Sequence, residues 1–142
     1  MLYEKAFQKE IWEAVRTEKA YAPLLGALLE DYRAVSKEGP VSAVRFSEYI
    51  IYRETGCRQN YEALYFARRK RLNTYALMAL IYPEEEEHLL QLQDTIWAIC
   101  DEYTWALPAH IAWKTGRDPG NIDLFSAETG FALSTIYHLL GG

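Results

Sequence analysis

The stretch DEYTWALPAH, at residues 101–110, gathers side chains that could bind a ligand. Tyr103 and Trp105 offer flat apolar faces with a polar edge, which suit stacking on sugar rings. Glu102 supplies an acid, and His110 supplies a group that titrates near neutral pH. A proline within the stretch cannot continue a helix, so we expect a helix to end here and turn into a loop. Side chains at such an end escape core packing and can point into a cleft.

Structural roles are the alternative for the same residues. Tryptophan and tyrosine at helix junctions more often pack in the core or at its rim than form ligand platforms. A lone histidine is more often a hydrogen-bonded structural residue than a catalyst. A stand-alone enzyme that uses His110 with Glu102 is the least favoured interpretation, because no nucleophile or metal-ligand set accompanies them.

The elements that must position this stretch are all predicted to be helices. A period of about 3.6 residues runs through almost the whole sequence, and no segment has the alternation of a strand. Glycine and proline mark the stops at 39–40, 56, 83 and 108. The predicted helices cover about 2–18, 21–37, 43–55, 60–82, a segment from Pro83 to Tyr103, and 124–140, with Asn60 and Asp123 as caps.

The helix that leads into residues 101–110 is predicted to bury one stripe. Its apolar residues follow 3-4-3-4 spacing and form a set of five: Leu89, Leu92, Ile96, Ile99 and Tyr103. Proline suits the first helical position and Glu84–Glu87 suit the positive end of the helix dipole, so this acidic run indicates a helix start more than a metal site. Pro108 is predicted to be the limit of the helix or a break just beyond it. For Trp97, packing is the default expectation.

The basic run ARRKRL, at residues 67–72, does not predict one charged face. Four consecutive cations span about 300° of a helix, so they cannot share one side. Solvated positions that pair with nearby acids are the favoured interpretation, and a site for a sulfated glycan is the weaker one.

The last predicted helix is apolar around much of its circumference. A helix of that kind requires neighbours on most sides, and the last element of the chain has few of them. We therefore expect either the first part of a longer protein or an obligate homo-oligomer formed through the C-terminal helix. The corresponding alternative function is a non-catalytic helical module for protein interaction or self-association.

Composition excludes several classes of function. The chain has 142 residues, which suits one domain spanning 1–142, and half of them are hydrophobic, so it can form a packed core. A net charge of −5 argues against nucleic acid as the main partner. No apolar run is long enough for a membrane span, and the N-terminus lacks a secretion signal, so we expect a cytoplasmic protein. Cys57 and Cys100 match no zinc or redox spacing, and no cofactor is expected.

Three segments of the second half carry a resemblance to a known family. They are ALIYPE at 79–84, DTIWAICDEYTWALPAH at 94–110 and IDLFSAETGFAL at 122–133. Together they resemble the N-terminal helical region of heparinase II/III-like proteins. The resemblance implies helical hairpins that form part of an incomplete (α/α) toroid, followed in the family by β-sandwich domains.

The resemblance also implies an activity for the parent protein. The better-known members are polysaccharide lyases that cleave uronic-acid polymers by β-elimination, in which a base removes the proton next to the uronate carboxylate. The catalytic asparagine, histidine and tyrosine of the family lie on later toroid helices, so no catalytic role is assigned here and the segment alone is expected to be inactive. Glu102, Tyr103, Trp105 and His110 match the open side of the toroid, where they would contact an acidic oligosaccharide. On this basis Trp105→Ala should weaken glycan binding, while Trp97→Ala should chiefly lower stability.

Overall fold

The computed structural model describes residues 4–111 and 122–141, and within these ranges the chain is all-helical. Its α-helices are α1 (Lys9–Thr17), α2 (Ala22–Lys37), α3 (Phe46–Thr55), α4 (Gln59–Ile81), α5 (Glu86–Cys100) and α6 (Leu124–Leu140). Three short 3-10 helices accompany them: η1 (Glu4–Phe7), η2 (Lys19–Tyr21) and η3 (Pro108–His110). None of the described residues forms a strand, so the predicted all-α class is confirmed.

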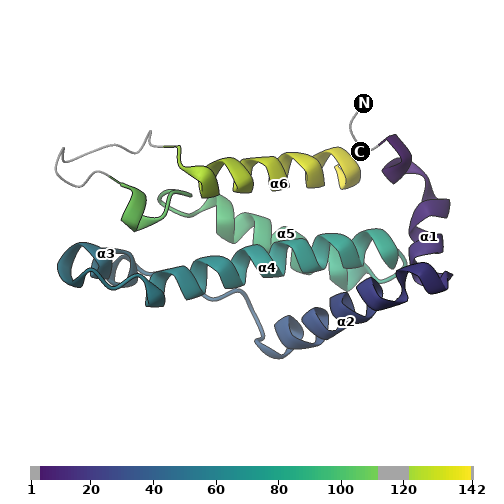
Figure 1. Cartoon of the computed structure of the whole chain (residues 1–142), viewed down its shortest axis with the longest axis horizontal. Coiled ribbons are helices and arrows are strands. Elements are labelled where there is room, and N and C mark those ends of the chain that lie inside the picture. The colour runs from purple at the N-terminus through teal and green to yellow at the C-terminus, as the bar shows by residue number, and fades with distance from the viewer. Residues whose placement is uncertain (1–3, 112–121, 142) are drawn as a thin grey trace.

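The long helix α4 is the axis around which the others are arranged. It contacts each of the other five α-helices, most extensively α5, with which it forms a hairpin across the turn at residues 82–85. In Figure 1, α3 lies at one end of α4 and α1 at the other, while α2 and α6 run along opposite sides. No helix in the described part of the chain is long and apolar enough to cross a membrane.

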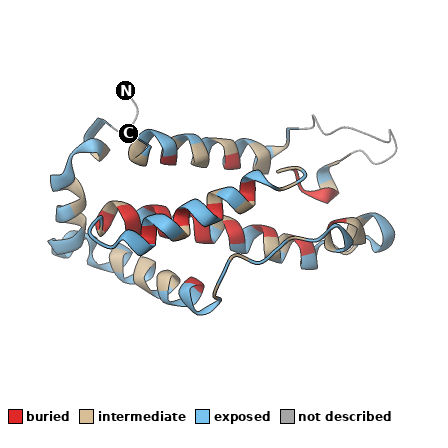
Figure 2. Cartoon of the chain, turned by 180° about the vertical axis from the view of Figure 1, so that it is seen from behind, coloured by how far each residue is buried: buried red, intermediate tan, exposed pale blue. Residues whose placement is uncertain are grey.

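Two clusters of buried side chains form the core. The larger one joins α2, α4, α5 and α6 and contains Val35, Leu72, Tyr75, Ala76, Leu92, Ile99 and Ile136. The smaller one lies where α3 and η3 meet α4, and contains Tyr49, Tyr61, Tyr65 and Leu107. Figure 2 shows that the buried residues are concentrated on α4 and α5. The central position of α4 explains why buried residues occur on several of its sides.

Local signals explain the helix ends that agree with the prediction. Gly39 and Gly56 both adopt φ of 74°, the left-handed conformation that closes α2 and α3. The Asp123 carboxylate accepts a hydrogen bond from the Ser126 amide and so caps α6, as predicted. The bounds of α2 and α6 lie within one residue of the predicted ranges.

Other helix starts differ from the prediction. The first predicted helix is divided into η1 and α1, so residues 2–18 do not form one helix. Asn60 lies inside α4, whose N-cap is Arg58 without a side-chain cap. Pro83 is not the first residue of α5, because α5 begins at Glu86. The acidic run nevertheless supplies Glu86 and Glu87 to the first turn of α5, where the helix dipole favours them.

The end of α5 is the main correction. The helix ends at Cys100, well before Pro108, which instead opens η3. The reason is capping by side chains outside the helix, one from the loop that follows it and one from α4, which satisfy its last carbonyls. The Trp105 indole N–H donates to the Ile99 carbonyl at 2.9 Å, and Arg68 donates to the Ala98 carbonyl at 3.1 Å.

The predicted stripe of α5 is only partly buried. Leu92 and Ile99 are buried and Ile96 is half-buried, whereas Leu89 is exposed. Tyr103 follows the end of the helix and is 78% exposed, so it does not continue the stripe.

Candidate functional site

Glu102 is a buried carboxylate held by two arginines. Its side chain is only 3% exposed. Arg69 binds it through both oxygens, with Nη1–Oε1 of 2.6 Å and Nη2–Oε2 of 2.7 Å, and Arg68 Nη1 donates to Oε1 at 2.9 Å. We call Arg68, Arg69 and Glu102 the ion-pair cluster. Paired in this way, Glu102 serves as a structural anchor between α4 and the end of α5.

The ion-pair cluster corrects the interpretation of the basic run. Arg68 and Arg71 are both buried, at 8% and 4% exposure, and are not solvated. Arg69 stacks on the ring of Tyr65 with its guanidinium carbon 3.6 Å from the ring centroid. Arg68 and Arg69 do pair with an acid, as expected, but while buried; Lys70 is both exposed and paired, with Asp31 at 2.6 Å.

Beside this cluster lies an open groove between the end of α5 and the segment that leads into α3. It has a volume of about 670 Å³, within the range of ligand-binding pockets. It is lined by Val41, Ala43, Val44, Arg45, Phe46, Tyr49, Tyr61, Arg68, Trp97, Ala98, Asp101, Glu102 and Tyr103. We call it the α3–α5 groove.

Aromatic rings give the α3–α5 groove its chemical character. Trp97 is 80% exposed, and Phe46 and Tyr103 are exposed to a similar extent. The expectation that Trp97 packs in the core is therefore wrong. The sequence already indicated this exposure, because on a helical wheel Trp97 lies well away from both buried residues Leu92 and Ile99.

Two further tyrosines of the groove are neutral hydrogen-bonding groups. Burial and, to a smaller extent, the neighbouring Tyr103 together raise the pKa of Tyr49 to about 12. Burial also raises the pKa of Tyr61, with an added contribution from Glu102. Both phenols therefore keep their protons near neutral pH and can hydrogen-bond a ligand without acting as a base.

Trp105 does not line the groove. It is half-buried and packs against the larger core cluster. Its ring also lies beside Gly130 of α6, where a Cβ atom, if present, would be 4.0 Å from the ring. Its indole N–H caps α5, and its carbonyl accepts a hydrogen bond from the Tyr65 hydroxyl at 3.0 Å. Trp105 therefore joins α4, α5 and α6.

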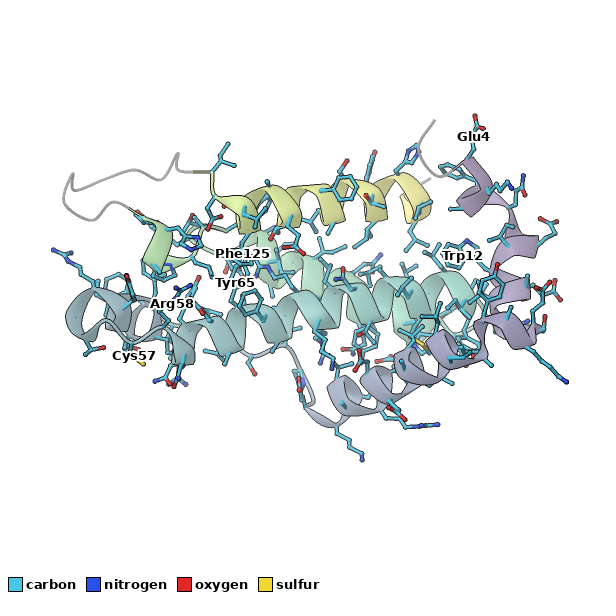
Figure 3. The ribbon with its side chains drawn as sticks, in the orientation of Figure 1. Glu4, Trp12, Cys57, Arg58, Tyr65 and Phe125 are labelled. Carbon is cyan, nitrogen blue, oxygen red and sulfur yellow. The ribbon has the colours of Figure 1, made fainter. Side chains whose placement is uncertain are left out.

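His110 is the last residue of η3 and lies against the N-cap of α6, outside the α3–α5 groove. Its Nδ1 lies 2.7 Å from Asp123 Oδ2 and donates to this carboxylate, whose oxygens only accept. Its ring stacks on Phe125 with 5.8 Å between centroids. Figure 3 shows Phe125 directed toward Tyr65 of α4, which places the stack over the smaller core cluster.

The structure thus brings together two of the four predicted site residues. Glu102 and Tyr103 line the α3–α5 groove, whereas Trp105 and His110 lie elsewhere. The four residues that we expected to contact a ligand together do not share one depression, because α5 ends early and the chain turns inward at Trp105. Phe46, Arg45, Tyr49 and Trp97 are groove residues that the sequence did not predict. Residues 112–121 of the resembling region lie outside the described residues.

Asp123 gives a testable dependence of stability on pH. Burial alone would raise its pKa, but hydrogen bonds from the Ser126 amide, His110, the Leu107 amide and the Ser126 hydroxyl outweigh this and hold the pKa below its usual value. A carboxylate with a lowered folded-state pKa stabilises the fold above the unfolded pKa and loses this effect as pH falls through the folded pKa.

We therefore expect stability to fall below about pH 5 more steeply in the native chain than in Asp123→Asn, since asparagine caps a helix without titrating. Urea unfolding at pH 3 to 7 measures this difference. Parallel pH profiles for the two chains would contradict it.

The described residues contain no group of three or more His, Cys, Asp or Glu side chains arranged to hold a metal ion. No family model, curated protein or solved structure matches the chain.

Proposed function

We propose that the chain is the N-terminal helical segment of a heparinase II/III-like polysaccharide lyase, and that it holds an acidic oligosaccharide in the α3–α5 groove. The observation that carries this proposal is the set of exposed rings of Phe46, Trp97 and Tyr103 beside polar and charged groups in one groove. Two of these three rings, those of Trp97 and Tyr103, belong to the stretch that resembles the family.

The groove offers the two kinds of contact that sugars require. Exposed aromatic faces stack on the apolar faces of pyranose rings. Arg45 and Asp101, both exposed at the groove, can bind a carboxylate and hydroxyl groups respectively. We assign no proton transfer to this segment, because in the resembling family the elimination uses residues on later helices.

Trp97→Ala is expected to weaken binding of the oligosaccharide about tenfold, equivalent to about 1.4 kcal/mol. The reason is the loss of the largest exposed ring in the groove. Isothermal titration of tetrasaccharides derived from heparan sulfate and from alginate measures the effect. Tyr137→Ala is the matched control, since Tyr137 is equally exposed on α6 and lies outside the groove. The proposal fails if the native chain binds neither sugar, or if both variants bind like the native chain.

A second candidate function, self-association, is supported by the outer face of α6. Leu124 and Tyr137 are strongly exposed and Phe131 is 58% exposed, whereas Ile136 faces the core. Exposed apolar surface of this kind usually marks an interface. In this alternative the chain is a non-catalytic module that pairs through α6.

Phe131→Lys is expected to abolish self-association, because it introduces a charge at the centre of the exposed face of α6. Sedimentation equilibrium over a wide range of concentration measures the molecular mass. Leu77→Lys is the control, since Leu77 is also an exposed apolar residue but lies on α4. A native chain that remains monomeric at high concentration would exclude this alternative.

A further inference from the structure

Arg68 lies between the two walls of the α3–α5 groove. It is on α4, and its side chain is 9% exposed. Toward one wall it donates from Nε, at 3.1 Å, and from Nη2 to the Ser42 carbonyl. Toward the other wall it donates from Nη1 to the Ala98 carbonyl at 3.1 Å and to Glu102 at 2.9 Å. One guanidinium therefore binds both sides of the groove.

The wall that contains Ser42 has little other polar support. Residues 41–45 precede α3 and are not helical. In the described part of the chain, no backbone-to-backbone hydrogen bond involves residues 41–44. Val44 packs against the smaller core cluster, but the carbonyl of Ser42 is held by Arg68. The position of this wall therefore depends on the Arg68 side chain.

We infer that Arg68 is a positioning residue that sets the width of the α3–α5 groove by tying residues 41–45 to the end of α5. The further statement that the width of the groove governs ligand affinity rests on the proposed function. Only an arginine side chain can hold both walls at once, because its planar guanidinium group carries donors in several fixed directions. A lysine ammonium at the same place is a compact point charge that cannot reach both walls together.

The chain supplies a matched control in Arg71. This residue is on the same helix, is equally buried, and also donates to a backbone carbonyl, that of Val35 at 3.1 Å. It does not line the α3–α5 groove. Arg68→Lys and Arg71→Lys therefore make the same chemical change at similar burial, and only the first removes hydrogen bonds to the Ser42 carbonyl.

Backbone nitrogen-15 relaxation of the whole chain tests the inference directly, because it reports the mobility of residues 41–44 whether or not their amides are hydrogen-bonded. In Arg68→Lys we expect the order parameters of residues 41–44 to fall from the rigid value of about 0.85 to below about 0.6, while α2 and α6 keep native values. In Arg71→Lys, residues 41–44 should keep the native order parameters. Should Arg68→Lys fail to fold, Arg68→Gln replaces it, since Glu102 then remains paired with Arg69. Native order parameters for residues 41–44 in both Arg68 variants would overturn the inference.

Titration with the heparan sulfate tetrasaccharide tests the consequence for binding. We expect Arg68→Lys to weaken affinity at least tenfold and Arg71→Lys to change it less than twofold, both under conditions where the variants are folded. Lower order parameters for residues 41–44 with unchanged affinity would overturn the role of Arg68 in ligand binding. If the native chain does not bind the sugar, the proposed function fails, and the relaxation comparison alone decides whether Arg68 positions the wall.

Discussion

Replacing Glu102 with alanine should lower the free energy of unfolding by about 3–5 kcal/mol, the loss typical of breaking a buried ion pair. The change leaves the guanidinium groups of Arg68 and Arg69, which are 9% and 13% exposed, without their shared counter-charge. A buried cation without a partner costs far more than the original pair contributed. Urea unfolding followed by circular dichroism measures the loss.

The matched control is Glu62→Ala. Glu62 pairs with Arg58 at 2.6 Å, but the arginine is 49% exposed and the pair joins neighbouring turns of one helix. Exposed pairs of this kind contribute less than about 1 kcal/mol. If Glu102→Ala costs no more than Glu62→Ala, the ion-pair cluster does not hold α4 to the end of α5 as we conclude.

The helix ends that could be predicted from the sequence are those set by local chemistry. Gly56 closes α3 because its φ of 74° suits glycine, and Asp123 caps α6 because its carboxylate reaches the amide three residues later. Such signals lie within a few residues of the element that they bound. They are therefore visible in the sequence without any knowledge of the fold.

The end of α5 could not be predicted in this way. Its last carbonyls are capped by Trp105 and by Arg68, and the second of these is 30 residues from the carbonyl that it binds. The burial of Arg68 and Arg71 has the same origin, since each is compensated by carbonyls of distant segments. A pattern of charges along one helix carries no information about such partners.

Only part of the candidate site could be predicted, for a related reason. The stretch at residues 101–110 contains two groove residues, Glu102 and Tyr103, but the other wall comes from residues 41–49. Nothing in the spacing of these two segments predicts that they meet. Trp97 is different, because its angle to Leu92 and Ile99 on α5 already placed it off the buried stripe.

The two tryptophans at the end of α5 should respond to truncation in opposite ways. Trp105→Ala is expected to cost about 3–5 kcal/mol, because it removes a ring packed on the larger core cluster and leaves the Ile99 carbonyl without its indole donor. Trp97→Ala should change stability by less than about 0.5 kcal/mol, since that side chain is 80% exposed. Urea unfolding of the two variants gives both values.

These values reverse the roles that the sequence suggested, in which Trp105 binds sugar and Trp97 stabilises the fold. Sugar titration of the same variants completes the comparison. It is carried out without urea, under conditions in which Trp105→Ala is still folded. We expect the folded Trp105→Ala chain to keep its affinity within about twofold, because its ring lies outside the groove, while Trp97→Ala loses about tenfold. A stable Trp105→Ala chain with weakened binding would restore the original assignment, because only a ring in contact with the ligand could be dispensable for folding and needed for affinity.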